Sequence, residues 1–282
     1  FILLSPFSVE AISIKDYEKV PKSFYAVGSL VEHVQKKELI KGLQQFIKFT
    51  RPSRYPGSKG HHNSLIWIKK KLQEIGCNED SFSIESFDVD IEYGMRLYEN
   101  DFNQKIKKHF KKKSVEYING RKFTDSMQST LTKFKGYKGQ NLIWEKKGTS
   151  HSKEVIILAA HYDTIAFNKE KNKVTPEVLM PGADDNGTGV ITLISLIELL
   201  NQLKLPKTVR IIFFDYQEMG FLGSYAYTKV HKKELERNVK AFVSVEMLGN
   251  DSKIFDLDKK LRNFKTYISL FKEKNHRKEL AL

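Results

Sequence analysis

Four segments between Val155 and Gly249 constrain the fold of this chain more than any other feature of its sequence. In each of them, histidine or acidic residues stand at or near the end of a short apolar run. Uniformly apolar, β-branched runs predict strands that are covered on both faces, as in a parallel sheet. Ligands bind such sheets just beyond the C-terminal ends of the strands. The segments are VIILAAHYDT (155–164), PGADDNGTG (181–189), VRIIFFDYQEMGFLGS (209–224) and AFVSVEMLG (241–249).

The polar residues of these segments predict a metal site. A lone aspartate or histidine at a strand end is usually a cap or a turn former, but four such positions in chain order favour a shared site. Imidazole and carboxylate groups form a mixed nitrogen and oxygen set that zinc accepts. Asp163 follows His161 by two residues and is placed to accept the second ring N–H of a ligand histidine. The candidate ligands are His161, Asp184, Glu218 and Glu246.

The same motifs resemble those of the dizinc aminopeptidases, a zinc-peptidase family that also includes glutamate carboxypeptidase and the glutaminyl cyclases. The similarity rests on HYDT, PGADDNGTG, FFDYQEMGFLGS and VEMLG, and extends upstream to the segment RPSRYPGSKGHHNSLIWIKKKLQEIG (51–76). It covers most of residues 34–250 in the family's order. We therefore expect a three-layer α/β/α sandwich with a mixed, mostly parallel central sheet, of the zinc-peptidase (phosphorylase/hydrolase-like) type.

The resemblance also implies a role for each candidate ligand. His161 would bind one zinc ion, Asp184 would bridge two, and a cis peptide would join Asp184 to Asp185. Glu218 would bind the second ion, while Glu246 stands where the family has an aspartate on the first. Two zinc ions per chain and a peptide or aminoacyl substrate are therefore expected.

Two departures from the family pattern bear on catalysis. Gln217 occupies the position of the family's general base, and a neutral amide cannot accept a proton. A positioned general base contributes about 10² to 10⁴ in rate. The family also has a final histidine well after the VEMLG motif; His276 is a weak candidate for it, and we expect an incomplete C-terminal part. We take Gln217 and Asp163 as the candidate catalytic positions.

The sequence thus predicts a zinc-dependent exopeptidase of the aminopeptidase type, impaired by Gln217. Gln217 is compatible with a weak peptidase, with a substitution that traps a complex, or with an enzyme that uses another base. Other functions also stay open. They are a catalytically inactive binding protein, a glutaminyl cyclase, which usually lacks the first histidine, and a carboxypeptidase for acidic substrates.

Composition narrows the possible partners. The 282 residues carry 48 basic and 34 acidic side chains, a net charge of +14. The lysines are widely spread and no nucleic-acid motif is present, so we expect a solvated basic surface and no nucleic-acid partner. The single cysteine, Cys77, excludes an internal disulfide and a cysteine-based zinc site. No run of about 20 apolar residues predicts a membrane span.

The domain organisation follows from local composition. Residues 1–11 resemble the end of a signal peptide, with an apolar start and a Val9-Glu10-Ala11 cleavage pattern. We therefore expect residues 12–282 to form one zinc-peptidase domain in the periplasm or outside the cell. The alternating segment 81–93 predicts an antiparallel strand. Residues 94–138 then form an insertion, with six lysines between Gln104 and Lys113, that either binds an acidic partner or is simply solvated.

Overall fold

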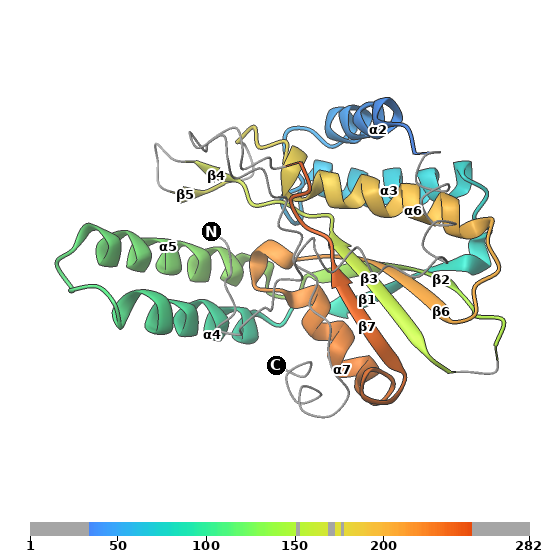
Figure 1. The fold of residues 1–282 in the computed structure, drawn as a ribbon. Coiled ribbons are helices and arrows are strands. Elements are labelled where there is room, and N and C mark those ends of the chain that lie inside the picture. Colours follow the sequence, from blue (N-terminus) through green and yellow to red (C-terminus); the bar gives the residue numbers. More distant parts are fainter. Residues whose placement is uncertain (1–33, 151–152, 169–172, 176–177, 250–282) are drawn as a thin grey trace, which may run out of the picture.

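The computed structural model describes residues 34–150, 153–168, 173–175 and 178–249, and a five-stranded sheet forms its centre (Figure 1). The strand order is β1-β2-β6-β3-β7. Strands β6, β3 and β7 pair in parallel, whereas β2 is antiparallel to both β1 and β6. Four of the five strands therefore run in one direction, which confirms the mixed, mostly parallel sheet. The strands are β1 (Phe82–Asp88), β2 (Lys138–Lys146), β3 (Val155–His161), β6 (Thr208–Phe214) and β7 (Val239–Ser244).

Helices cover both faces of this sheet and complete the predicted α/β/α sandwich (Figure 1). On one face, α6 packs on β3 and β6, and α2 and α3 pack on α6. On the other face, α7 contacts β1, β2 and β7. These helices are α2 (Lys36–Phe49), α3 (Lys59–Glu74), α6 (Gly189–Asn201) and α7 (Leu222–Arg237).

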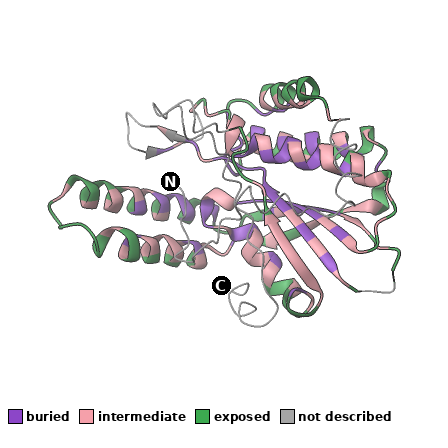
Figure 2. Ribbon diagram, in the orientation of Figure 1, coloured by how far each residue is buried: buried purple, intermediate pink, exposed green. Residues whose placement is uncertain are grey.

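The apolar run of β6 shows why the sequence favours a strand covered on both faces. Ile211 and Phe213 are fully buried in the core under α2, α3 and α6. Ile212 and Phe214 belong to a second core, which they share with Tyr227 of α7. Successive side chains of a strand point to opposite faces, so both sets of positions must be apolar. Figure 2 shows the buried residues along the strands and on the inner sides of the helices.

Strand β1 is antiparallel to β2, as the alternating pattern of residues 81–93 predicts, but it is shorter than that pattern. It ends at Asp88. The Asp90 side chain accepts a hydrogen bond from the Tyr93 N–H and caps helix α4, which begins at Ile91. An N-cap aspartate satisfies an otherwise unpaired N–H of the first turn, so the chain turns into a helix here.

A helical lobe, residues 91–134, separates β1 from β2 and contains most of the predicted insertion. Its two long helices contact each other and project from the sheet (Figure 1). At its base, Met127 and Leu131 share a buried cluster with Tyr216 and Met219, which lie just after β6. The lobe consists of α4 (Ile91–Asp101), the π-helix η3 (Phe102–Lys107), α5 (Val115–Leu131) and the turn η4 (Thr132–Phe134).

The remaining elements are short. They are η2 (Glu79–Ser81), the paired strands β4 (Phe167–Asn168) and β5 (Lys173–Val174), and two turns near the site, η5 (Ala183–Thr188) and η6 (Gln217–Met219). Within the described ranges, no helix combines the length and the apolar character that a membrane span requires. Residues 1–11, which we expect to be the end of a signal peptide, and His276 lie outside the described residues.

Candidate metal centre

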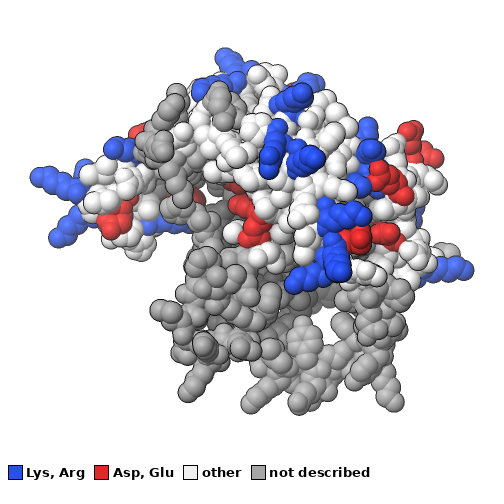
Figure 3. Space-filling model, turned by 90° about the horizontal axis from the view of Figure 1, so that it is seen from above, with Lys and Arg blue, Asp and Glu red and all other residues white. Residues whose placement is uncertain are grey.

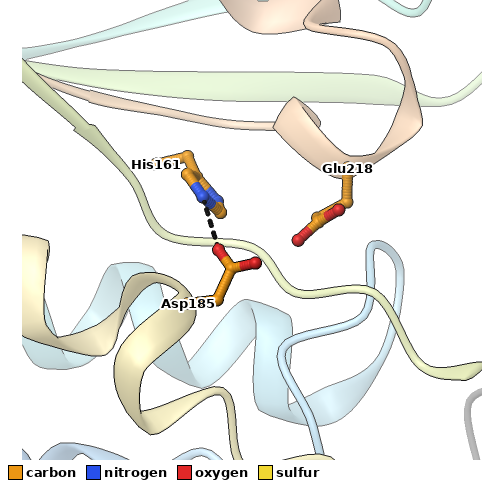
Figure 4. Close-up of side chains that lie close together, drawn as sticks. All are labelled: His161, Asp185 and Glu218. Carbon is orange, nitrogen blue, oxygen red and sulfur yellow. Dashed lines mark ion pairs between the residues drawn. The ribbon is translucent and has the colours of Figure 1, made fainter. Parts of the chain in front are cut away.

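His161, Asp185 and Glu218 lie together at the C-terminal edge of the parallel strands (Figure 4). His161 is the last residue of β3, and Glu218 lies in η6, just after β6. Asp185 lies in η5, the irregular turn before α6. Each residue offers one ligand atom, and these three atoms are all within 4.8 Å of one another. The group lies where ligands of parallel sheets bind.

Asp163 supports two members of this group from behind. The His161 Nδ1 atom lies 3.2 Å from the Asp163 carbonyl oxygen and 3.4 Å from its Oδ1 atom. The same buried carboxylate accepts hydrogen bonds of 3.0 Å from the backbone N–H groups of Gln217 and Glu218. Asp163 therefore holds the imidazole and the η6 turn in one arrangement, and the His161 Nε2 atom faces Asp185 at 3.1 Å.

The structure brings Asp185, and not Asp184, to His161. Asp184 turns the other way: its Oδ1 atom accepts a hydrogen bond of 2.8 Å from the Gly249 N–H, beyond β7. The cis peptide that the resemblance implied between Asp184 and Asp185 lies one bond later, between Asp185 and Asn186. Asp185 itself is non-helical, with φ −103° and ψ 97°. Its backbone leaves the helical path at this point, so adjacent carboxylates point in different directions.

Gln217 and Glu246 lie beside the group without joining it. The Gln217 Nε2 atom donates a hydrogen bond of 2.9 Å to the Glu246 Oε1 atom. Glu246 is exposed and follows β7. Among the residues that the structure describes, the potential metal ligands that cluster are His161, Asp185 and Glu218. The ligand role of Glu246 and the catalytic role of Gln217 stay predictions.

Arg54 is the residue of the upstream motif that organises the loop behind the site. It is fully buried. Its guanidinium donates hydrogen bonds to the backbone oxygens of Tyr162 (2.7 Å), Pro181 (2.6 Å) and Gly182 (2.9 Å). Burial lowers the pKa of Arg54 to about 10, although nearby carboxylates, including that of Asp163, oppose this shift. Arg54 thus ties the end of β3 to the loop that carries Asp185.

Replacing Arg54 by Met should destabilise the protein by about 3 to 5 kcal/mol, the usual cost of removing one partner from a buried charged network. The three carbonyl oxygens would lose their donors, and that of Tyr162 would stay buried. Urea denaturation followed by circular dichroism would measure the change. Arg54→Lys is the matched control: it keeps the charge but not the planar fork of donors, so most of the loss should remain. If Arg54→Lys were as stable as the unchanged protein, the guanidinium hydrogen bonds would not be what stabilises this loop.

Two members of the group have raised pKa values. Burial lowers the pKa of His161, but hydrogen bonds and charge from Asp163 and Asp185 outweigh burial and raise this pKa to about 10. Burial is the main reason that the pKa of Glu218 is raised to about 7; Asp185 adds to the shift and His161 opposes it. Without a metal, protons therefore partly balance this cluster of carboxylates. A divalent cation that replaced these protons would balance the same charge.

In chelator-treated protein, the free energy of unfolding should fall as the pH rises from about 5 to about 10. Both folded-state pKa values are above the ordinary values of 4.5 for Glu218 and 6.5 for His161, so the folded state binds more protons. The contribution of Glu218 is lost as the pH rises through about 7, and that of His161 as it rises through about 10. Urea titrations across this range measure the slope. His161→Gln should remove its upper part, and a slope of opposite sign would contradict the assignment.

Two further residues near the site were not predicted from the sequence. The His61 Nε2 atom lies 2.6 Å from Asp215 Oδ1, and only 14% of the His61 side chain is exposed. The Tyr98 hydroxyl of the lobe donates a hydrogen bond of 2.6 Å to the Glu218 carbonyl oxygen. For the contact between His61 and Asp215, the sequence offers one indication: Asp215 stands directly after the apolar run of β6. Nothing in the local sequence points to the contact between Tyr98 and Glu218.

These features define a class: an α/β/α sandwich with a candidate metal centre at the C-terminal ends of its parallel strands. The chain belongs to Peptidase family M28, whose model matches residues 141–281. Aminopeptidase YwaD of Bacillus subtilis is 30% identical over 139 residues, which are 48% of this chain and 28% of the relative. Leucine aminopeptidase 2 of Trichophyton rubrum is 30% identical over 138 residues, 48% of this chain and 25% of the relative. The matched part thus spans about a quarter of these curated relatives.

Solved structures support the fold. A glutaminyl cyclase from an Acidobacteriales bacterium superposes with a TM-score of 0.51 at 16% identity, covering 76% of this chain and 59% of that chain. A Zn-dependent exopeptidase from Parabacteroides distasonis superposes with a TM-score of 0.50 at 14% identity, covering 77% of this chain and 63% of that chain. At these identities the likeness is one of fold.

Proposed function

We propose that this chain is a zinc-dependent exopeptidase of the aminopeptidase type. The observation that carries the proposal is the group of His161, Asp185 and Glu218, whose ligand atoms converge within 4.8 Å. Membership of Peptidase family M28 and the similarity to aminopeptidases support it. The substrate would be a peptide or an aminoacyl compound with a free N-terminus.

The donors of this group suit zinc. One imidazole nitrogen and two carboxylates form a set that zinc binds, and Asp163 orients the imidazole as ligand histidines require. The Asp185 side chain is 48% exposed, so the centre is open on one side to a substrate. Zinc bound there would lower the pKa of a coordinated water and polarise a peptide carbonyl. We propose Asp185 in place of Asp184 as the bridging ligand of two ions, with Glu246 completing the set.

The side chain of Gln217 limits the activity that we propose. Its amide donates to Glu246 and has no basic atom that takes a proton at neutral pH. The chain would therefore bind metal and substrate but turn over slowly. The neutral amide at this position also favours a second candidate function, a peptide-binding protein without catalysis, because it leaves the site without a general base. The two differ in whether a carboxylate at this position restores turnover.

Zinc content and substrate profiling together test the proposal. Titrating zinc into chelator-treated protein in a calorimeter should show saturable binding with a defined stoichiometry. His161→Ala should lose this binding. A panel of aminoacyl amides, peptides with acidic C-terminal residues and peptides with N-terminal glutamine separates aminopeptidase, carboxypeptidase and cyclase activities. Turnover confined to peptides with acidic C-terminal residues, or cyclisation alone, would overturn the aminopeptidase assignment. Absence of zinc binding would overturn the metal centre itself.

A further inference from the structure

Basic side chains of the lobe are paired with acidic ones along its stem but not at its outer end. On the stem, Lys105 pairs with Asp101 at 2.8 Å, and Arg121 pairs with Glu99 at 2.8 Å and with Asp125 at 2.6 Å. At the tip, which we define as residues 107–118, five lysines are exposed and none of them forms an ion pair with a described residue. Lys108 donates a hydrogen bond to the Gln104 side-chain oxygen, and the other four have no side-chain partner among the described residues. These four are Lys107, Lys111, Lys112 and Lys113.

Apolar side chains are exposed among these lysines. Phe110 is 39% exposed, Val115 69% and Ile118 42%. The backbone that carries them is held by packing on the stem: the rings of Phe102 and Tyr117 lie edge to face, with centroids 5.2 Å apart. Val115 and Ile118 lie in the first turn of α5, and Phe110 lies in the turn that precedes this helix. Glu116 is the one acidic residue between Gln104 and Ile118.

We propose that this tip docks on an anionic membrane surface. Lysines attract the acidic headgroups of a bilayer, and apolar side chains between them enter the boundary between headgroups and acyl chains. A soluble acidic partner would account for the lysines but not for Phe110, Val115 and Ile118 beside them. The charge and the apolar groups together match a lipid surface.

The position of the tip suits this role. The lobe projects from the sheet (Figure 1), and Figure 3 shows Lys and Arg side chains extending from its outer end. Helix α5 has 17 residues and therefore spans about 25 Å. The base of the lobe, at the other end of α5, packs beside the η6 turn of the metal centre. Docking through the tip would therefore leave that centre accessible to peptides. This docking does not depend on the proposed activity.

Vesicle sedimentation with the purified chain tests this proposal. We expect binding to vesicles of phosphatidylcholine with about one-third phosphatidylglycerol, and at least about tenfold weaker binding to phosphatidylcholine alone. The charge reversal K111E/K112E/K113E should weaken binding at least about tenfold, and F110S/V115S at least about threefold. The matched control is K204E/K232E/K233E, which reverses three exposed lysines outside the lobe and should retain most of the binding. Circular dichroism melts confirm that the variants are folded.

Three results would overturn the proposal. The first is no binding to the anionic vesicles at about 0.1 M salt, where charge attraction still reaches about 10 Å. The second is an equal loss in the tip and control reversals, which would show that only the overall basic charge matters. The third is unchanged binding by F110S/V115S together with full competition by soluble polyglutamate. That result would assign the tip to an acidic polymer instead of a bilayer.

Discussion

Replacing Gln217 by Glu should raise the turnover of aminoacyl amides at least about a hundredfold, because it supplies the general base that the centre lacks. Gln217 lies next to Glu218 in η6, and its backbone N–H is fixed by Asp163 at 3.0 Å. The introduced carboxylate would occupy nearly the same position. Glu246, now 2.9 Å from the Gln217 amide, would face this carboxylate and, in the metal-free protein, raise its pKa, as neighbouring carboxylates do.

Steady-state kinetics at saturating zinc would measure this gain. The matched control is Gln217→Ala, which removes the amide and adds no base, so turnover should not rise. If Gln217→Glu binds zinc and gains nothing, the centre is either served by another base or non-catalytic, and the peptide-binding alternative becomes the better one. Binding of a non-hydrolysable peptide analogue would then distinguish these two cases.

Replacing Asp185 by Asn should weaken zinc binding at least about a hundredfold. Mutating a residue that only hydrogen-bonds a metal ligand already lowers metal affinity about tenfold to a hundredfold. Asp185 is placed to be a direct ligand, so its loss should cost at least as much. It lies 3.1 Å from His161 Nε2, and its pKa is lowered chiefly by its hydrogen bond with His161. An amide keeps the shape of the side chain but lacks the charge and one of the two acceptor oxygens.

The neighbouring residue provides the control for this experiment. Asp184→Asn makes the same chemical change one residue earlier, where the carboxylate accepts from the Gly249 N–H and lies near the Thr188 hydroxyl. We expect it to retain most of the zinc affinity, measured by competition with a chelator. A larger loss in Asp184→Asn would return the bridging role to Asp184, and equal losses in both variants would contradict the assignment of that role to Asp185 alone.

Much of this fold was predictable because its signals are local. The apolar runs that become β3 and β6 predict strands covered on both faces, and the structure buries alternate residues of β6 in two different cores. The position of His161 and Glu218 at strand ends follows from the same runs. The lobe was predictable as an insertion from its lysines, but its helices and its contact with η6 were not.

The sequence by itself determined the α/β/α sandwich, the edge of the sheet where polar residues gather and the kinds of ligand present there. Tertiary structure decided which of these residues meet. The local sequence does not distinguish Asp184 from Asp185, since the two are adjacent residues of the same type. A non-helical backbone at Asp185 and a hydrogen bond from Gly249, 65 residues away, turn them apart. Arg54 bonds to carbonyls 108 to 128 residues away. Such contacts depend on how distant segments pack, which the periodicity of a single segment does not encode.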